Sequence, residues 1–177
     1  MAAAPPTRAM SLMVLALVVV ALQTQTAAAT ALPNGSPFTN ATGISWRPSQ
    51  AAQCTCGSIT FAADPSLDPA SWRQCAALYS HWTSENGTFG VANADGHFSY
   101  RPLVGQTDCA LAIAPLASTV GPYLIGSKDI EAILQRSLRD FSYGSLLAVN
   151  GTVECDVASG GRAPMSWRIS KPPPVVK

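Results

Sequence analysis

Five cysteines, Cys54, Cys56, Cys75, Cys109 and Cys155, constrain this chain more than any other feature of its sequence. In a protein outside the cell such a set forms disulfide bonds, whereas inside a cell it more often binds metal or carries out redox chemistry. An odd number leaves one cysteine without an intramolecular partner. Five choices of the spare residue, each with three pairings of the other four, give 15 arrangements, and spacing alone does not select one.

The N-terminus predicts the compartment. Arg8 precedes an apolar run from Met10 to Leu22, and small residues follow, with Ala29 and Ala31 fitting an A-x-A cleavage site. The run is shorter than the roughly 18 apolar residues that a membrane-spanning helix needs. We therefore expect residues 1–31 to be a signal peptide and the mature protein to be secreted and extracellular, with no membrane anchor.

The charge balance argues against a nucleic-acid partner. Without Arg8, ten Lys and Arg residues face ten Asp and Glu residues, so the mature chain is close to neutral and has no basic patch to attract a polyanion. Four N-glycosylation sequons agree with a secretory route and predict a glycoprotein. Their asparagines are Asn34, Asn40, Asn86 and Asn150.

Composition divides the mature chain into three parts. Residues 32–51 are rich in Pro, Gly, Ser, Thr and Asn and have no apolar period, which predicts a flexible leader. Trp46 is the exception in this segment: it is expected either to dock locally on the domain or to offer an exposed contact. Residues 171–177 form a Pro-rich tail that cannot continue a helix. Residues 52–170 have the size of a single domain with its own core, and we expect a monomer.

Two segments have the period of amphipathic helices. The first is expected to open with Asp68 as its N-cap and Pro69 at its first position. The second is expected to start at the cap Ser127. The residues that share an apolar face are Trp72, Cys75, Ala76, Tyr79 and Trp82 in the first, and Ile130, Ile133, Leu134, Ser137, Leu138 and Phe141 in the second.

The remaining segments alternate in polarity or lie between turn signals, as strands do. In 109–114 the larger side chains share one face, and in 149–157 Val149, Val153 and Cys155 face one way while Asn150 and Glu154 face the other. The second of these strands is expected to begin at Leu146 and so to span 146–157, and other strands are expected at 57–61, 87–91, 97–103 and 165–170. This order predicts an α+β sandwich, an antiparallel sheet with two helices packed on one face, stabilised by disulfides.

From Cys56 to Ile169 the chain resembles the necrosis-inducing factor domain of secreted effectors from plant-pathogenic fungi. The resemblance rests on CGSITF at the start, Ile125-Gly126 with Asp129-Ile130, Gly151-x-Val153-x-Cys155, and Trp167. It implies a fold related to that of a secreted fungal killer toxin of the α/β-sandwich type. It also implies a role in virulence or host cell death, through a host (plant) protein or a microbial target.

Three classes of function stay open: an effector that binds a host component, a killer-type toxin against competing fungi, and a small glycan-binding protein or hydrolase. No HExxH or G-x-S-x-G motif is present, and His81 and His97 lack partners at catalytic spacing. We therefore expect no enzyme activity, no catalytic or metal-binding residue, and no cofactor. Trp72 and Trp82, on the apolar face of the first helix, are expected in the core.

The resemblance also bears on the cysteines. The family has four, matched here by Cys56, Cys75, Cys109 and Cys155, whereas Cys54 has no counterpart. Cys75 and Cys109 both point toward the expected core, and Cys155 needs a partner from the N-terminal segment. Strict alternation would turn Cys56 outward unless Gly57 supports a bulge. We predict Cys56–Cys155 and Cys75–Cys109, with Cys54 unpaired; Cys54–Cys155 is the alternative.

The first testable prediction concerns processing. The secreted form should begin near Leu32, because the small-residue site directly follows a run too short to anchor the chain. N-terminal sequencing of protein from the culture medium checks this. Recovery of a form that still carries Met10 to Leu22 would contradict it.

Overall fold

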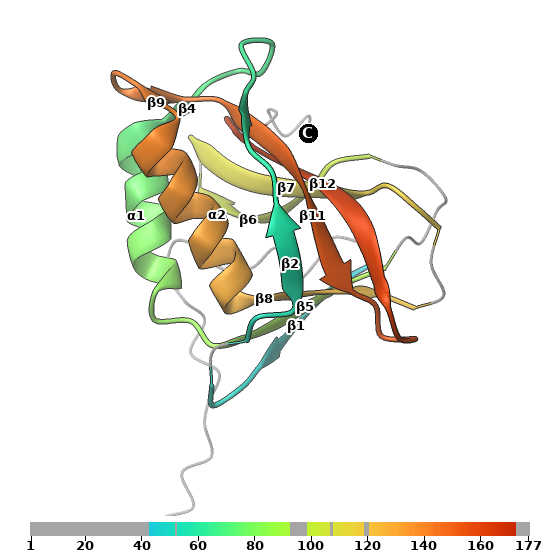
Figure 1. Ribbon diagram of the computed structural model, residues 1–177. Helices are drawn as coiled ribbons and strands as arrows, with labels where there is room; N and C mark the ends of the chain where they lie inside the picture. The colour runs from blue at the N-terminus through green and yellow to red at the C-terminus, as the bar shows by residue number, and fades with distance from the viewer. Residues whose placement is uncertain (1–42, 52, 93–98, 107, 119–120, 173–177) are drawn as a thin grey trace, which may run out of the picture. The chain divides into compact units, whose positions relative to one another are not determined.

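The computed structural model describes residues 43–51, 53–92, 99–106, 108–118 and 121–172. Within them, antiparallel strands form three sheets and are accompanied by two helices (Figure 1). The fold class is therefore α+β with disulfides, as the sequence predicts. No helix in this part of the chain has the length and apolar character needed to cross a lipid bilayer. The expected signal peptide lies outside the described residues.

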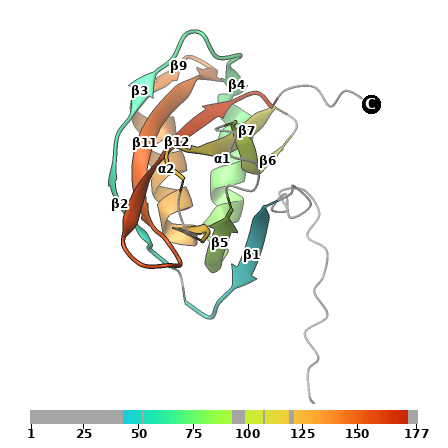
Figure 2. The ribbon, with the colours of Figure 1, turned by 90° about the vertical axis from the view of Figure 1, so that its right-hand side faces the viewer.

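The largest sheet carries most of the core. Its strand order is β2-β11-β12-β7-β6, and the short strand β3 also pairs with β11. Both helices lie on the same face of this sheet, as Figure 2 shows. The bounds are Cys56–Ile59 for β2, Ala62–Ala63 for β3, Arg101–Gln106 for β6, Cys109–Pro115 for β7, Val149–Asp156 for β11 and Arg162–Ser170 for β12.

A second sheet corrects the predicted leader. Strand β1 (Ile44–Pro48) pairs with β5 (Gly87–Val91), which pairs in turn with β8 (Tyr123–Gly126). Ile44 is buried at 5% exposure, and Trp46 packs on Trp82 and Phe89 with ring centroids 5.4 and 4.6 Å apart. Residues 44–48 are thus part of the folded domain, because β5 supplies the backbone partners and apolar contacts that their own composition lacks.

The first helix begins later than predicted. Residues 70–71 form β4 (Ala70–Ser71), which pairs with β10 (Leu146–Leu147) and through it with β9 (Ser142–Tyr143). The helix α1 (Trp72–Trp82) therefore has Ser71 at its N-cap, and the assignment of Asp68 and Pro69 to its start is wrong. Pairing with a distant strand has overridden the local helix-start signal.

The buried face of α1 is also shifted. Cys75, Leu78 and Trp82 are 0 to 1% exposed, whereas Trp72 is 40% exposed and donates from its ring N–H to the Leu138 carbonyl at 3.4 Å. The prediction that Trp72 is a core residue is wrong. The prediction for Trp82 is confirmed. Because α1 starts only at Trp72, the Trp72 ring lies at the N-terminal end of the helix and stays partly exposed to solvent.

The second helix matches its predicted face. In α2 (Ser127–Asp140) Ile130, Ile133, Leu134 and Ser137 are buried, and α2 packs beside α1. The N-cap is Gly126, one residue before the predicted Ser127. The shift has a physical reason: the carboxylate at the third helical position, Asp129, accepts the Gly126 N–H at 2.9 Å, and the Ser127 hydroxyl is used elsewhere.

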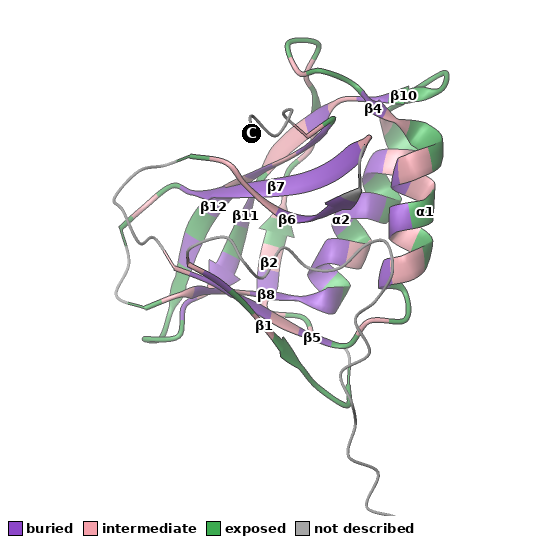
Figure 3. Cartoon of the chain, turned by 180° about the vertical axis from the view of Figure 1, so that it is seen from behind, coloured by how far each residue is buried: buried purple, intermediate pink, exposed green. Residues whose placement is uncertain are grey.

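Burial follows the predicted alternation in β11, where Val149, Val153 and Cys155 are at most 2% exposed and Glu154 is exposed. Strand β7 is buried on both faces, as the continuous purple ribbon in Figure 3 shows. At Gly151 a side chain would overlap the Thr60 carbonyl oxygen and the Trp167 ring. Glycine there lets β11 approach these neighbours closely.

The second prediction tests the core under α2. Leu134→Ala should lower the free energy of unfolding by about 2 to 5 kcal/mol, because it leaves a cavity where a side chain at 0% exposure is packed. Denaturant melts measure the change. The control is Gln135→Ala, next to it on the exposed face. Arg136, although 54% exposed, is less suitable because its guanidinium lies 4.5 Å from the centre of the Phe61 ring. Equal losses of unfolding free energy in Leu134→Ala and Gln135→Ala would contradict the assignment of Leu134 to the buried face of α2.

Candidate functional site

Two disulfides tie the helices and strands together. Cys56 bonds Cys155 with Cα atoms 3.9 Å apart, and Cys75 bonds Cys109 with Cα atoms 5.3 Å apart. The first joins β2 to β11 and the second joins α1 to β7. These are the pairs predicted from the sequence. Cys54 is exposed and forms no disulfide.

A bulge in β2 lets Cys56 face the core. Ile59 pairs with Val153 and Cys56 with Cys155, so three steps along β2 match two along β11. The extra residue breaks strict alternation, and Cys56 is buried at 8% exposure. The irregular start predicted around Gly57 is therefore present.

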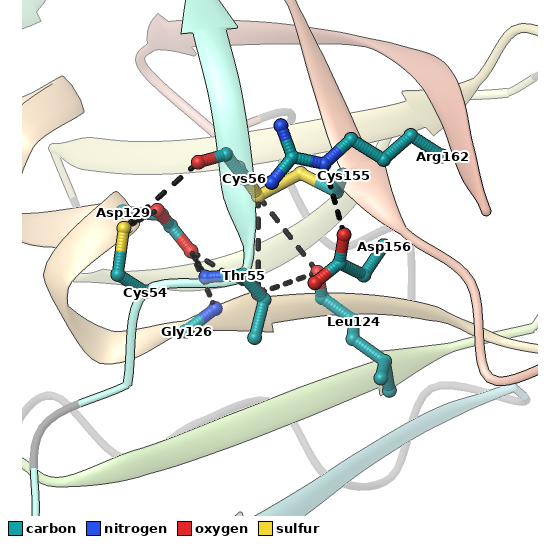
Figure 4. The surroundings of a disulfide bond; sticks show 9 residues. All are labelled: Cys54, Thr55, Cys56, Leu124, Gly126, Asp129, Cys155, Asp156 and Arg162. Atoms are coloured by element: carbon teal, nitrogen blue, oxygen red, sulfur yellow. Dashed lines mark hydrogen bonds and ion pairs between the residues drawn. A yellow bond between two sulfur atoms is a disulfide. The ribbon is translucent and has the colours of Figure 1, made fainter. Parts of the chain in front are cut away.

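Cys54 lies beside a buried carboxylate at the N-terminus of α2 (Figure 4). Its thiol donates to Asp129 Oδ1 at 3.3 Å, and the next residue, Thr55, donates its backbone N–H to Asp129 Oδ2 at 2.8 Å. The hydrogen bond to Asp129, then the negative charge of that carboxylate, raises the pKa of the Cys54 thiol. A thiol held protonated is a weak nucleophile, so this cluster does not have the character of a catalytic cysteine site.

A concave surface lies at the opposite end of α2, which spans 14 residues or about 21 Å. It is a groove of about 420 Å³ between the segment 63–69 and the β9–β10 hairpin. We call it the hairpin groove. Its lining residues are Ala63, Asp64, Pro65, Leu67, Pro69, Phe141, Tyr143, Leu146, Leu147 and Ala148.

The hairpin groove exposes apolar side chains that the core does not use. Tyr143 is 88% exposed and Leu146 is 44% exposed, and the two residues pair across the hairpin. Exposed aromatic and aliphatic groups that gather at a concavity mark a contact surface more often than scattered single residues do. By contrast Trp46, the sequence-based candidate for exposed contact, is partly buried against Trp82 and Phe89.

One carboxylate lines this apolar groove. Asp64 Oδ1 accepts from the backbone N–H of Ser66 at 3.0 Å and from its hydroxyl at 2.6 Å, while Oδ2 accepts from the Asn150 side chain at 2.7 Å. The Ser66 bonds lower the pKa of Asp64, with Asn150 adding to the effect. Asp64 therefore gives the groove a fixed negative charge at its edge.

The remaining predicted sites are spread over the surface. Asn86 is exposed after α1, and Asn150 is partly buried in β11, where its amide is engaged by Asp64. Asn34 and Asn40 lie outside the described residues, as does His97. His81 faces Glu85 across 3.8 Å at the end of α1. Among the described residues no group of three or more His, Cys, Asp or Glu side chains could hold a metal ion.

Sequence reasoning missed both Asp129 and the hairpin groove. The sequence places Asp129 only within a family motif, and the signal for its further role is its position three residues after a glycine N-cap. Tyr143 and Leu146 flank Gly144 and Ser145, so a turn signal between two apolar residues was available for the hairpin.

The fold, the two bridges and the solvent-facing groove describe a small disulfide-bonded domain of the kind found in secreted proteins. Residues 55–155, more than half of the chain, match the model of the family Hce2, described as "pathogen effector; putative necrosis-inducing factor". The chain belongs to this family. Membership supports a secreted, effector-like role in general. A search of curated proteins found no match.

The structure gives the family motifs a physical meaning. Cys56 and Cys155 form a bridge, Asp129 accepts the Gly126 N–H beside it, and a side chain at Gly126 would overlap the Gln53 carbonyl. These contacts show that Cys56, Cys155, Gly126 and Asp129 hold the fold together.

The third prediction separates structural from spare cysteines. Cys75→Ser should lower stability by about 2 to 5 kcal/mol, the usual cost of losing a native bridge in a small secreted domain. Cys54→Ser should leave the thermal midpoint nearly unchanged, because a hydroxyl can still donate to Asp129. Thermal melts of both variants measure the difference. A large loss at Cys54 with none at Cys75 would contradict the bonding pattern.

Proposed function

We propose that this protein is a fungal effector that is secreted into the host and contributes to virulence or plant cell death by binding a plant protein through the hairpin groove. The observation that carries the proposal is the exposed pair Tyr143 and Leu146 beside the apolar groove of about 420 Å³. Family membership supplies the effector context. Aromatic and aliphatic anchors of this kind dominate the energetics of protein interfaces.

The chain acts by binding rather than by catalysis. Asp64 is the one carboxylate among the described residues that line the groove, and its oxygens already accept hydrogen bonds from Ser66 and Asn150. A lowered pKa keeps it ionised, so it is poorly suited to act as a general acid. Its charge instead favours a partner that presents a Lys or Arg next to apolar side chains.

Glycan binding is a second candidate. A solvent-exposed tyrosine can stack on the apolar face of a sugar ring, and the Asp64 carboxylate, which accepts from the Asn150 amide, lines the same groove. The killer-type toxin is the third class, supported by the fold resemblance alone.

The fourth prediction tests the groove in leaves. Infiltration of the mature protein should cause cell death, and the double variant Tyr143→Ser/Leu146→Ser should need at least about tenfold more protein, as expected when a hot-spot contact is lost. The matched control is Leu116→Ser, because Leu116 is 46% exposed but does not line the groove. Circular dichroism checks that all three proteins are folded.

The same proteins separate the alternatives. Equal cell death from the double variant and the wild type would contradict a role for the groove. Inhibition of yeast or filamentous fungi without any leaf response would favour the killer-type toxin. Retention on insoluble chitin that is lost with Tyr143→Ser would favour glycan binding.

A further inference from the structure

The segment that carries Cys54 and Cys56 is clamped onto the N-terminus of α2. The backbone N–H of Lys128 donates to the Gln53 carbonyl at 2.9 Å, and the Gln53 N–H donates to the Ser127 hydroxyl at 3.3 Å. On the other side the Asp156 N–H donates to the Thr55 carbonyl at 2.9 Å. The segment is therefore held between the helix and β11.

Asp129 is the centre of this clamp. Its carboxylate, at 3% exposure, accepts from the Gly126 N–H at 2.9 Å, the Thr55 N–H at 2.8 Å and the Cys54 thiol at 3.3 Å. The Thr55 hydroxyl lies 3.2 Å from the same carboxylate and 2.8 Å from the Leu124 carbonyl. Figure 4 shows Asp129 between the helix start and the residue that separates the two cysteines. One side chain thus fixes the helix cap, Thr55 and the spare thiol together.

Without such a clamp the choice between the two cysteines is chemically open. Cys54 and Cys56 are two residues apart, so in an extended segment their side chains point the same way, about 7 Å apart. Sliding the segment by two residues would bring Cys54 opposite Cys155. The bulge at the start of β2 shows that the pairing of this strand with β11 is already irregular here.

We propose that Asp129 is the positioning residue that determines which cysteine bonds Cys155. It holds Thr55 in the one register that places Cys56 opposite Cys155, and it engages the Cys54 thiol on the side of the helix. When Asp129 is removed, the bond to Cys155 is shared between Cys56 and Cys54.

The rearrangement that Asp129 prevents is a thiol–disulfide exchange and needs no external oxidant. The Cys54 thiol loses its proton, and the thiolate attacks Cys155 Sγ. The Cys54–Cys155 bond forms as the Cys56–Cys155 bond breaks. Cys56 leaves as a thiolate and takes up a proton, so the count of bonds, protons and electrons is unchanged.

The thiol chemistry supports this direction. The hydrogen bond and negative charge of Asp129 raise the pKa of Cys54, which lowers the fraction of attacking thiolate. Removing the Asp129 carboxylate has two effects. The segment 53–56 loses its hydrogen bonds to the helix side chain and can move, and the Cys54 thiol ionises more readily.

The experiment compares the wild type with Asp129→Ala after oxidative refolding in a glutathione buffer. The unpaired thiol is trapped with N-ethylmaleimide, and peptide mapping without reduction locates the label by fragmentation. The wild type should carry it on Cys54. In Asp129→Ala the fraction labelled on Cys56 should rise about tenfold, the change expected when the preference falls by the worth of one charge-assisted hydrogen bond. Glu131→Ala is the matched control, because it removes another carboxylate from the start of the same helix and should leave the label on Cys54.

A rescue variant covers the case in which Asp129→Ala folds poorly. Adding Cys54→Ser leaves Cys56 without a competitor, so Asp129→Ala/Cys54→Ser should recover the folding yield and form Cys56–Cys155. Folded Asp129→Ala that still labels only at Cys54 would overturn the proposal. So would a yield that Cys54→Ser does not restore, because Asp129 would then act only as a helix cap.

Discussion

The attachment of residues 53–56 to the first turn of α2 is the interaction on which the rest of the domain depends. Asp129 and the Lys128 N–H hold this segment at one end of the helix, and the Cys56–Cys155 bond continues from it into β11. Because β8 runs directly into α2 at Gly126, the same junction also sets where the second sheet meets the helices. A helix N-terminus has unpaired N–H groups that must find acceptors, and here the Gln53 carbonyl, in the segment before β2, accepts one of them. The junction therefore satisfies the helix and positions a disulfide at the same time.

Features with a local period could be predicted from the sequence, and features made by distant partners could not. The buried stripe of α2 and the alternation of β11 follow from spacing within one element, so Leu134 and Val153 were placed correctly. Strand β1 and strand β4 exist only because β5 and β10 lie beside them, and nothing within residues 44–48 or 70–71 encodes that pairing. The N-cap of α2 lies one residue before the predicted Ser127, because Asp129 accepts the Gly126 N–H and the distant Gln53 N–H donates to the Ser127 hydroxyl.

The residues of the family motifs do not line the hairpin groove, and Phe61 of CGSITF reaches it only by stacking on Phe141. Gly126, Asp129 and Cys155 secure the junction, while Gly151 and Trp167 permit close packing under β11. None of these residues lines the groove. The motifs therefore define the scaffold, whereas Tyr143 and Leu146, which lie outside them, add exposed apolar surface to the groove.

The groove is also built so that its surface can change at little cost to the fold. Each strand of the β9–β10 hairpin has only two residues. Gly144, at the turn, adopts a positive φ of 58° and has open space around it. The inner face of the hairpin is anchored by Leu147 at 1% exposure, whereas Tyr143 and Leu146 project outward. Exposed substitutions away from buried contacts usually change stability by no more than about 0.5 kcal/mol. The junction and the two disulfide bridges thus stabilise the fold independently of the exposed residues Tyr143 and Leu146.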